Sequence, residues 1–165
     1  MQNKPFNADD FEFESLEQEL QADQHCQRLL LDYYNWLQQN GMTPQEATQL
    51  AYSADYYLRD YLLDHLRANP LKPQDGIVRY FAGNWYIVKN MEPEQKQLSQ
   101  HLLAIQQLYT YIKQLELITQ EELNQLMTET LETDFYTQRI ADFLALAGDG
   151  YTEWDNDCTI NMVTR

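Results

Sequence analysis

Strong helix-start signals recur along this sequence, and each is followed by apolar residues at helical spacing. Thr43 can cap a helix that has Pro44 at its first position and Glu46 at its third, and Thr119 with Glu122 repeats this capping box. No stretch shows a convincing alternation of apolar and polar residues, which is the pattern of a half-buried strand. The sequence therefore predicts an all-α fold, a single-domain bundle of five or six helices joined by short loops.

The helical domain is predicted to span residues 15–147. Its first helix begins at Ser15, and one apolar stripe follows at helical spacing, made of Leu16, Leu20, Cys26, Leu30, Tyr33 and Leu37. Residues 1–14 are predicted to form a mobile acidic arm whose three phenylalanines can dock on the domain. Residues 148–165 are predicted to form an acidic C-terminal tail that packs loosely or is mobile.

The middle of the chain predicts a short third helix. Pro70 and Pro73 make a stiff connection before it, and Asp75 is expected to cap it. Its buried face consists of Ile77, Val78, Phe81, Ala82 and Trp85. A helix this short cannot stand alone, so we expect Trp85 to anchor it in the core. Further on, the apolar stripe slips by one residue at positions 133–135, which indicates a break in the last helical stretch.

Charge is abundant and unevenly distributed. The chain has 165 residues, enough for one domain, and a formal net charge of -15. Residues 1–66 hold three basic and twelve acidic side chains, and residues 114–165 hold two and eleven. Residues 67–113 hold six basic and three acidic side chains. A mildly basic centre therefore lies between two acidic ends, and the excess of negative charge repels phosphate and anionic lipid.

Residues that carry catalysis or bind metals are few and scattered. His25, His65 and His101 lack the paired spacing of metal-ligand motifs, and Cys26 and Cys158 are far apart in the sequence. The sequence also lacks a glycine-rich phosphate loop and the Gly-x-Ser-x-Gly motif of a hydrolase nucleophile. We therefore expect no metal, no cofactor and no enzymatic activity, with both thiols reduced.

The hydropathy pattern predicts no association with a membrane. No stretch approaches the 18 or so consecutive apolar residues of a transmembrane helix. The first residues, MQNKPFNADDFEFE, also lack the basic start and apolar middle of a signal peptide. The expected location is the cytoplasm.

Four short segments resemble the N-terminal core-binding domain of tyrosine recombinases and phage integrases, a small SAM-like helical bundle. They are YYNWL at 33–37, GMTP at 41–44, FAGNW at 81–85 and LYTYI at 108–112, within a similarity that extends over residues 29–136. The resemblance implies a SAM-like fold and a domain that clamps DNA. The catalytic residues of that family belong to a separate C-terminal domain, for which the 18 residues after position 147 leave no room. Cleavage activity is therefore not expected.

The favoured functional hypothesis is a non-catalytic protein-interaction module. Tyr52, Tyr56 and Tyr57 cover more than one face of the second helix, so some of their rings should reach the surface. Tyrosine is enriched at interfaces because it offers both contact area and a polar tip. These three residues are the candidate contacts, with another protein or a second copy of the chain as the partner.

The alternative hypothesis is a DNA-binding module that uses the basic segment 67–113. Its candidate contacts to phosphate are Lys72, Arg79, Lys89, Lys96 and Lys113. The net charge disfavours this alternative, as do Asp55, Asp60 and Asp64 on the helix that the resemblance places near the duplex. We expect weak or no binding to duplex DNA at physiological salt. A third hypothesis is a small regulator whose acidic faces mimic DNA.

Overall fold

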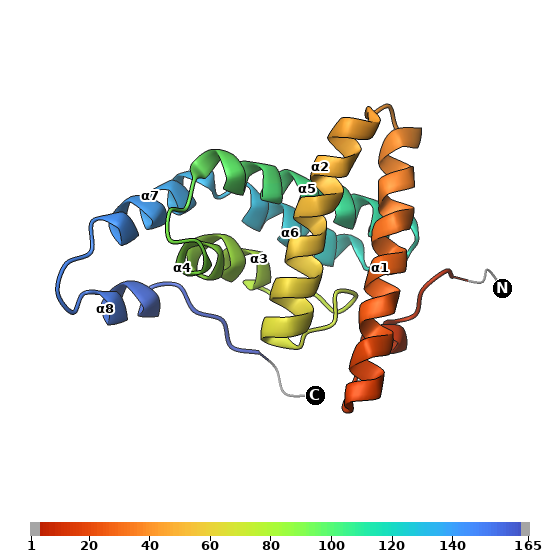
Figure 1. Ribbon diagram of the computed structural model, residues 1–165, viewed down its shortest axis with the longest axis horizontal. Helices are drawn as coiled ribbons and strands as arrows, with labels where there is room; N and C mark the ends of the chain where they lie inside the picture. The colour runs from red at the N-terminus through yellow and green to blue at the C-terminus, as the bar shows by residue number, and fades with distance from the viewer. Residues whose placement is uncertain (1–3, 163–165) are drawn as a thin grey trace.

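The computed structural model describes residues 4–162, and every regular element in that range is helical (Figure 1), which confirms the predicted all-α class. The longer elements are α1 (Leu16–Gln39), α2 (Pro44–Asp55), η2 (Tyr56–Leu66), α5 (Gln95–Gln114), α6 (Gln120–Thr130) and α7 (Thr133–Leu144). The shorter ones are η1 (Ala8–Phe11), α3 (Ile77–Tyr80), η3 (Phe81–Trp85), α4 (Tyr86–Lys89) and α8 (Tyr151–Asn156). Of these, η1 is a 3₁₀ helix, whereas η2 and η3 are π-helices.

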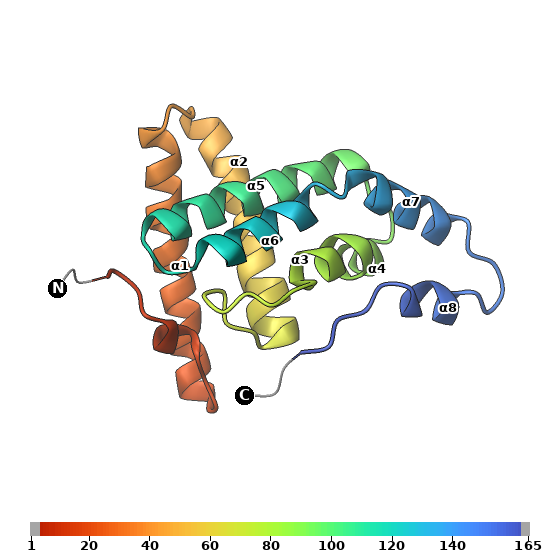
Figure 2. The same cartoon turned by 180° about the vertical axis from the view of Figure 1, so that it is seen from behind.

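Several elements join into longer rods. α2 continues directly into η2, and α3, η3 and α4 form one rod, so the described residues hold seven helical rods besides η1. Figures 1 and 2 show α1 and the α2–η2 rod as an antiparallel pair, crossed by α5, with α6 running beside α5. The α3–η3–α4 rod lies between this pair and α8. The sequence predicted five or six helices. The additional one is α8, which lies in the segment predicted to be the C-terminal tail.

The predicted capping boxes are present at the starts of α2 and α6. The Thr43 N–H donates to the Glu46 carboxylate at 3.0 Å, and the Glu46 N–H donates to the Thr43 hydroxyl at 3.2 Å. Thr119 and Glu122 make the same pair of bonds at 2.9 and 3.1 Å. Gly41 lies in the turn between α1 and α2. Its φ is 98°, a left-handed conformation that glycine adopts at little cost.

The start of α3 differs from the prediction, because Asp75 does not cap it. Gly76 takes the N-cap position with a φ of 87°, and the cap is supplied by Glu129 from α6. The buried Glu129 carboxylate accepts hydrogen bonds from the N–H groups of Gly76, Val78 and Arg79 at 2.9–3.1 Å. A distant carboxylate therefore satisfies the backbone donors that Asp75 was expected to cap.

Aromatic rings fill the core where the two π-helices meet. The ring of Phe81 on η3 lies 5.1 Å from the rings of both Tyr57 and Tyr61 on η2, measured between centroids. The Trp85 ring lies 5.2 Å from that of Tyr61 and is buried. Trp85 is thus a core residue, as its position on the predicted third helix indicated.

Both predicted end segments contain residues of the core. In the described part of the arm, Phe6 and Phe11 are buried, and Phe13 packs against the core. In the tail, Trp154 of α8 and Cys158 are buried. The two segments were predicted to be mobile or loosely packed, but these residues are packed in the core. Residues 1–3 and 163–165 of the two segments lie outside the described range. Aromatic residues explain the difference, since their burial outweighs the polar composition around them.

Candidate functional site

A groove runs between the N-terminal half of α1 and the π-helix η2. Its lining residues come in equal numbers from the two helices: Leu16, Glu19, Leu20 and Asp23 from α1, and Arg59, Asp60, Leu63 and Asp64 from η2. The groove has a volume of about 360 Å³. We call it the acidic groove, because four carboxylates and one guanidinium line it.

The geometry of the two helices explains why these residues meet. On α1, positions 16, 19, 20 and 23 share one face, since residues three and four apart are neighbours on an α-helix. On η2, hydrogen bonds join residues five apart, so side chains four and five apart lie on the same side. The two faces lie next to each other because α1 and the α2–η2 rod pack side by side (Figure 1).

Two leucines of the acidic groove, Leu16 and Leu20, are exposed to solvent. Leu16 has 72% of its surface exposed and Leu20 has 58%, whereas Leu63, which lines the groove from η2, is buried. Leu16 and Leu20 lie one turn apart on α1, so they form a continuous apolar strip. Both belong to the apolar stripe predicted for the first helix, but the core does not cover them.

Negative charge surrounds this apolar strip. Arg59 pairs with Asp23 at 2.8 Å and with Asp55 at 3.1 Å, and Arg67 pairs with Glu19 at 3.6 Å. Asp60 and Asp64 form no ion pair within residues 4–162. Partial burial raises the pKa of Asp60, and the negative charges of Asp55 and Asp64 raise it further. The groove therefore keeps a negative potential that its own cations do not neutralise.

The three tyrosines predicted as interaction residues do not form one surface. Tyr52 is 74% exposed, Tyr56 is half-buried, and Tyr57 is completely buried. The Tyr56 ring faces inward, 5.2 Å from the ring of Trp85, and burial raises the pKa of its hydroxyl. Tyr57 belongs to the core, so it cannot make the predicted surface contact. Only Tyr52 remains a candidate contact from this set.

The basic residues of segment 67–113 are dispersed, and several are already paired. Lys72 pairs with Glu12 at 2.6 Å, and Arg79 pairs with Glu132 at 3.1 Å. Lys96 and Lys113 lie near opposite ends of α5, which places them about 25 Å apart at 1.5 Å per residue. Lys89 lies over the face of Trp85, with 5.9 Å between its Nζ and the ring centroid. The structure does not bring these five side chains together.

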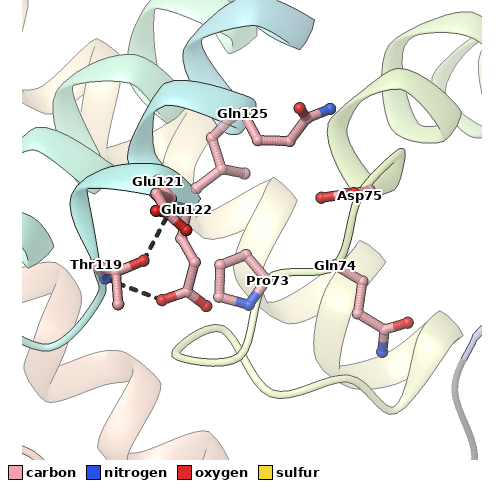
Figure 3. A pocket seen from close by; sticks show the side chains of 8 residues that line it. Pro73, Gln74, Asp75, Thr119, Glu121, Glu122 and Gln125 are labelled. Atoms are coloured by element: carbon pink, nitrogen blue, oxygen red, sulfur yellow. Dashed lines mark hydrogen bonds between the residues drawn. The ribbon is translucent and has the colours of Figure 1, made fainter.

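A second pocket lies between the loop before α3 and the start of α6 (Figure 3). It has a volume of about 310 Å³, and its carboxylates are Asp75, Glu121 and Glu122. The Glu122 side chain is engaged in the capping box with Thr119, as the dashed lines in Figure 3 show. This pocket has no exposed large apolar side chain in its lining. It therefore offers less contact energy than the acidic groove.

A third cleft lies beside the π-helix η3 and α8. Trp85, Lys89, Tyr151 and Asp155 are among its lining residues, and its volume is about 430 Å³. Its charges are balanced, since its lining includes one lysine and one aspartate. Asp155 is also occupied structurally, because its carboxylate accepts a hydrogen bond from the Asn84 amide at 2.9 Å. The cleft thus contributes to the attachment of α8.

The two cysteine thiols, which are the candidate nucleophiles, are both buried. Cys26 and Cys158 are free thiols, and burial raises the pKa of Cys26 to about 12. A thiol with so high a pKa is a poor nucleophile near neutral pH. Across residues 4–162, no group of three His, Cys, Asp or Glu side chains is placed to hold a metal ion. The same part of the chain contains no helix that is both long and apolar enough to cross a membrane.

Comparisons with protein-family models, curated proteins and solved structures found no match to this chain. The resemblance to the core-binding domain of recombinases therefore stays a prediction from short sequence segments, as does the SAM-like type of the bundle. The acidic groove is the feature of this structure that points to a function.

The sequence pattern missed the acidic groove because it places Leu16 and Leu20 in the same apolar stripe as Cys26. Leu20 lies six residues before Cys26, and this spacing places it on a different face of α1 from the buried residues. A usable signal was nevertheless present in the residues around them. Glu17, Glu19 and Asp23 lie beside the two leucines, whereas residues 24–39 contain one carboxylate, that of Asp32. This concentration of carboxylates marks the end of the helix that the core does not cover.

Proposed function

We propose that this chain is a protein-interaction module that binds a partner protein in the acidic groove. The observation that carries the proposal is the exposure of Leu16 and Leu20 on one face of α1, in a groove that the buried Leu63 also lines. Burying a leucine side chain contributes about 1.5–3 kcal/mol. A partner that covers both leucines would gain contact energy at a site that α1 and η2 have already formed.

The charges of the groove favour a protein over DNA as the partner. Four carboxylates in a groove repel phosphate, and phosphate contacts need free Lys or Arg side chains. Lys72 and Arg79, two of the candidate DNA contacts, are held in ion pairs. A second copy of the chain is also disfavoured at this face, since a symmetric contact would bring Asp60 and Asp64 close to the same carboxylates of the other copy.

Site-specific photocrosslinking in the cell that makes the protein tests the proposal. A photoreactive amino acid replaces Leu20 in one variant and Leu144, an equally exposed leucine of α7, in a control. We expect position 20 to capture a defined protein that position 144 does not capture. That protein is then purified, and its affinity for the chain is measured by calorimetry.

The affinity measurement decides whether the captured protein uses the groove. Leu16→Gln combined with Leu20→Gln should weaken binding about 30-fold, which corresponds to about 2 kcal/mol. The control Leu131→Gln combined with Leu144→Gln changes two leucines of similar exposure elsewhere and should leave the affinity unchanged. Equal affinities for both double variants would contradict the proposed function.

A further inference from the structure

The shape of the acidic groove indicates which kind of protein segment fits it. Its walls are two helices that pack side by side, and its apolar strip follows the axis of α1. The α1 wall of the groove extends from residue 16 to residue 23, about 10 Å or two turns of an α-helix, and the apolar strip forms its first turn. A furrow between two helices accepts a third helix, whose apolar side chains enter at i, i+3 or i+4, and i+7.

The acidic groove offers few backbone hydrogen-bonding groups to an extended peptide. Peptides that bind in an extended form usually add a strand to the edge of a sheet, through main-chain hydrogen bonds. All the regular elements of residues 4–162 are helical, so their N–H and C=O groups are largely used within the helices. The groove therefore offers side chains rather than backbone groups to a ligand.

The charges of the groove determine the chemistry of that helix. Glu19, Asp23, Asp60 and Asp64 line the groove next to the leucines, and Arg59 is the one cation among the lining residues. Arg59 is already engaged by Asp23 and Asp55. Asp60 and Asp64 form no ion pair with any residue in the described part of the chain. These two carboxylates are available to lysine or arginine side chains that flank an apolar face.

Resting on the proposed function, we infer that the partner segment is a basic amphipathic helix. Its apolar side chains, spaced over about two turns, cover Leu16 and Leu20. Its Lys or Arg side chains flank that apolar face and pair with Asp60 and Asp64. Complementary charge speeds the encounter and selects the partner, whereas the leucines provide most of the contact area.

Synthetic peptides of about 14 residues test this inference at about 150 mM salt. The probe has leucines at i, i+4 and i+7 and lysines on its remaining faces. A second peptide scrambles the same composition, and a third replaces each lysine by glutamate. Fluorescence anisotropy should show that the probe binds at least 10-fold more tightly than the scrambled peptide. No binding of the glutamate peptide is expected.

Variants of the protein separate binding in the groove from general attraction to an acidic protein. Asp60→Asn with Asp64→Asn should weaken binding of the probe about 10-fold, as should Leu16→Gln with Leu20→Gln. The matched control, Glu121→Gln with Glu153→Gln, removes the same charge on α6 and α8 and should change the affinity less than twofold. Equal weakening by the two charge variants, or equal binding of probe and scrambled peptide, would overturn the inference.

The two proposals fail in different ways. If the protein captured at position 20 depends on Leu16 and Leu20 but the basic probe does not bind, the function stands and the inferred chemistry is wrong. If substitution of the leucines leaves the affinity for the captured protein unchanged, the proposed function itself is wrong. Circular dichroism of each variant, expected to match the parent because the changed side chains are at the surface, verifies that folding is intact.

Discussion

Arg139 of α7 and Trp154 of α8 are joined by two reciprocal hydrogen bonds. The Arg139 guanidinium donates to the Trp154 carbonyl at 2.6 Å, and the Trp154 indole N–H donates to the Arg139 carbonyl at 3.0 Å. The guanidinium also lies over the indole ring, 3.8 Å from its centroid, and donates to the carbonyl of Gly83 at 2.8 Å. One buried side chain therefore connects α7, η3 and the C-terminal tail.

Replacing this guanidinium should destabilise the whole domain. Arg139→Ala removes the guanidinium hydrogen bonds to the carbonyls of Gly83 and Trp154, and a hydrogen bond to a charged group contributes about 1.5–3 kcal/mol. We expect a loss of about 2–4 kcal/mol in the free energy of unfolding, measured by denaturant titration. Gln138→Ala, an exposed change on the same helix, should alter it by less than about 0.5 kcal/mol. Similar losses for the two variants would show that the network contributes little.

Local signals account for the parts of the fold that the sequence predicted. The helix starts at Thr43 and Thr119 depend on residues within one turn of each other, so they are visible in the chain itself. The Arg139 network joins positions 56 and 15 residues away, which no local pattern reveals. The packing of α8 was missed for this reason, because its attachment depends on partners from α7 and η3.

The candidate site was not predicted, for a related reason. Helical spacing shows which residues share a face, but it does not show how far the neighbouring helices extend along that face. Leu16 and Leu20 lie on a different face of α1 from the buried Ala22 and Cys26, and both stay exposed. The tyrosine hypothesis failed at Tyr57 because this residue lies three positions after Ala54 and seven after Leu50, on the buried face of the α2–η2 rod.

Gly83 lies where η3 and the tail meet, and a methyl group should not fit there. A Cβ at this position would lie 2.9 Å from the Cys158 sulfur and 3.2 Å from Cε2 of Phe135. Gly→Ala inside a helix ordinarily stabilises by about 0.5–1 kcal/mol, but overpacking costs about 1–3 kcal/mol. We therefore expect Gly83→Ala to destabilise by about 1–2 kcal/mol in thermal or denaturant unfolding.

A second substitution checks the cause of this loss. Cys158→Ala removes the sulfur that the new methyl group would meet, so the double variant should be less destabilised than the sum of the two single changes. A coupling energy of about 0.5 kcal/mol or more is expected for groups in direct contact. Strict additivity would mean that the tail does not approach Gly83 as closely as described.

The buried Glu129 carboxylate should contribute to stability because it accepts several hydrogen bonds at once. It accepts from three N–H groups at the start of α3 and from the Gln125 amide at 2.9 Å. Glu129→Gln keeps one acceptor oxygen and directs an NH₂ group at donors, so a loss of about 2–3 kcal/mol is expected. Hydrogen exchange should speed up at the amides of Gly76, Val78 and Arg79. Glu121→Gln on the same helix is the control, and unchanged exchange in Glu129→Gln would contradict the capping role.

His101 makes stability depend on pH in a defined direction. Its ring is buried on α5 between the rings of Tyr56 and Tyr86, with centroids 5.1 and 5.5 Å away. Burial lowers its pKa from 6.5 to about 4, because the core does not solvate an imidazolium. The unfolded chain therefore binds a proton more readily than the folded chain between these two values. Its contribution to stability is fully present above pH 6.5 and is lost as the pH falls toward 4.

The shift predicts a loss of about 2 kcal/mol from this residue between about pH 7.5 and pH 5. Carboxylates titrate in the same region, so the test compares the protein with His101→Phe, which retains a ring and cannot be protonated. The difference between their free energies of unfolding should favour the variant progressively as the pH falls. His65→Gln, at an exposed histidine, controls for the loss of an imidazole in general. A difference between the protein and His101→Phe that stays constant with pH would mean that His101 is solvated and can be protonated in the folded state.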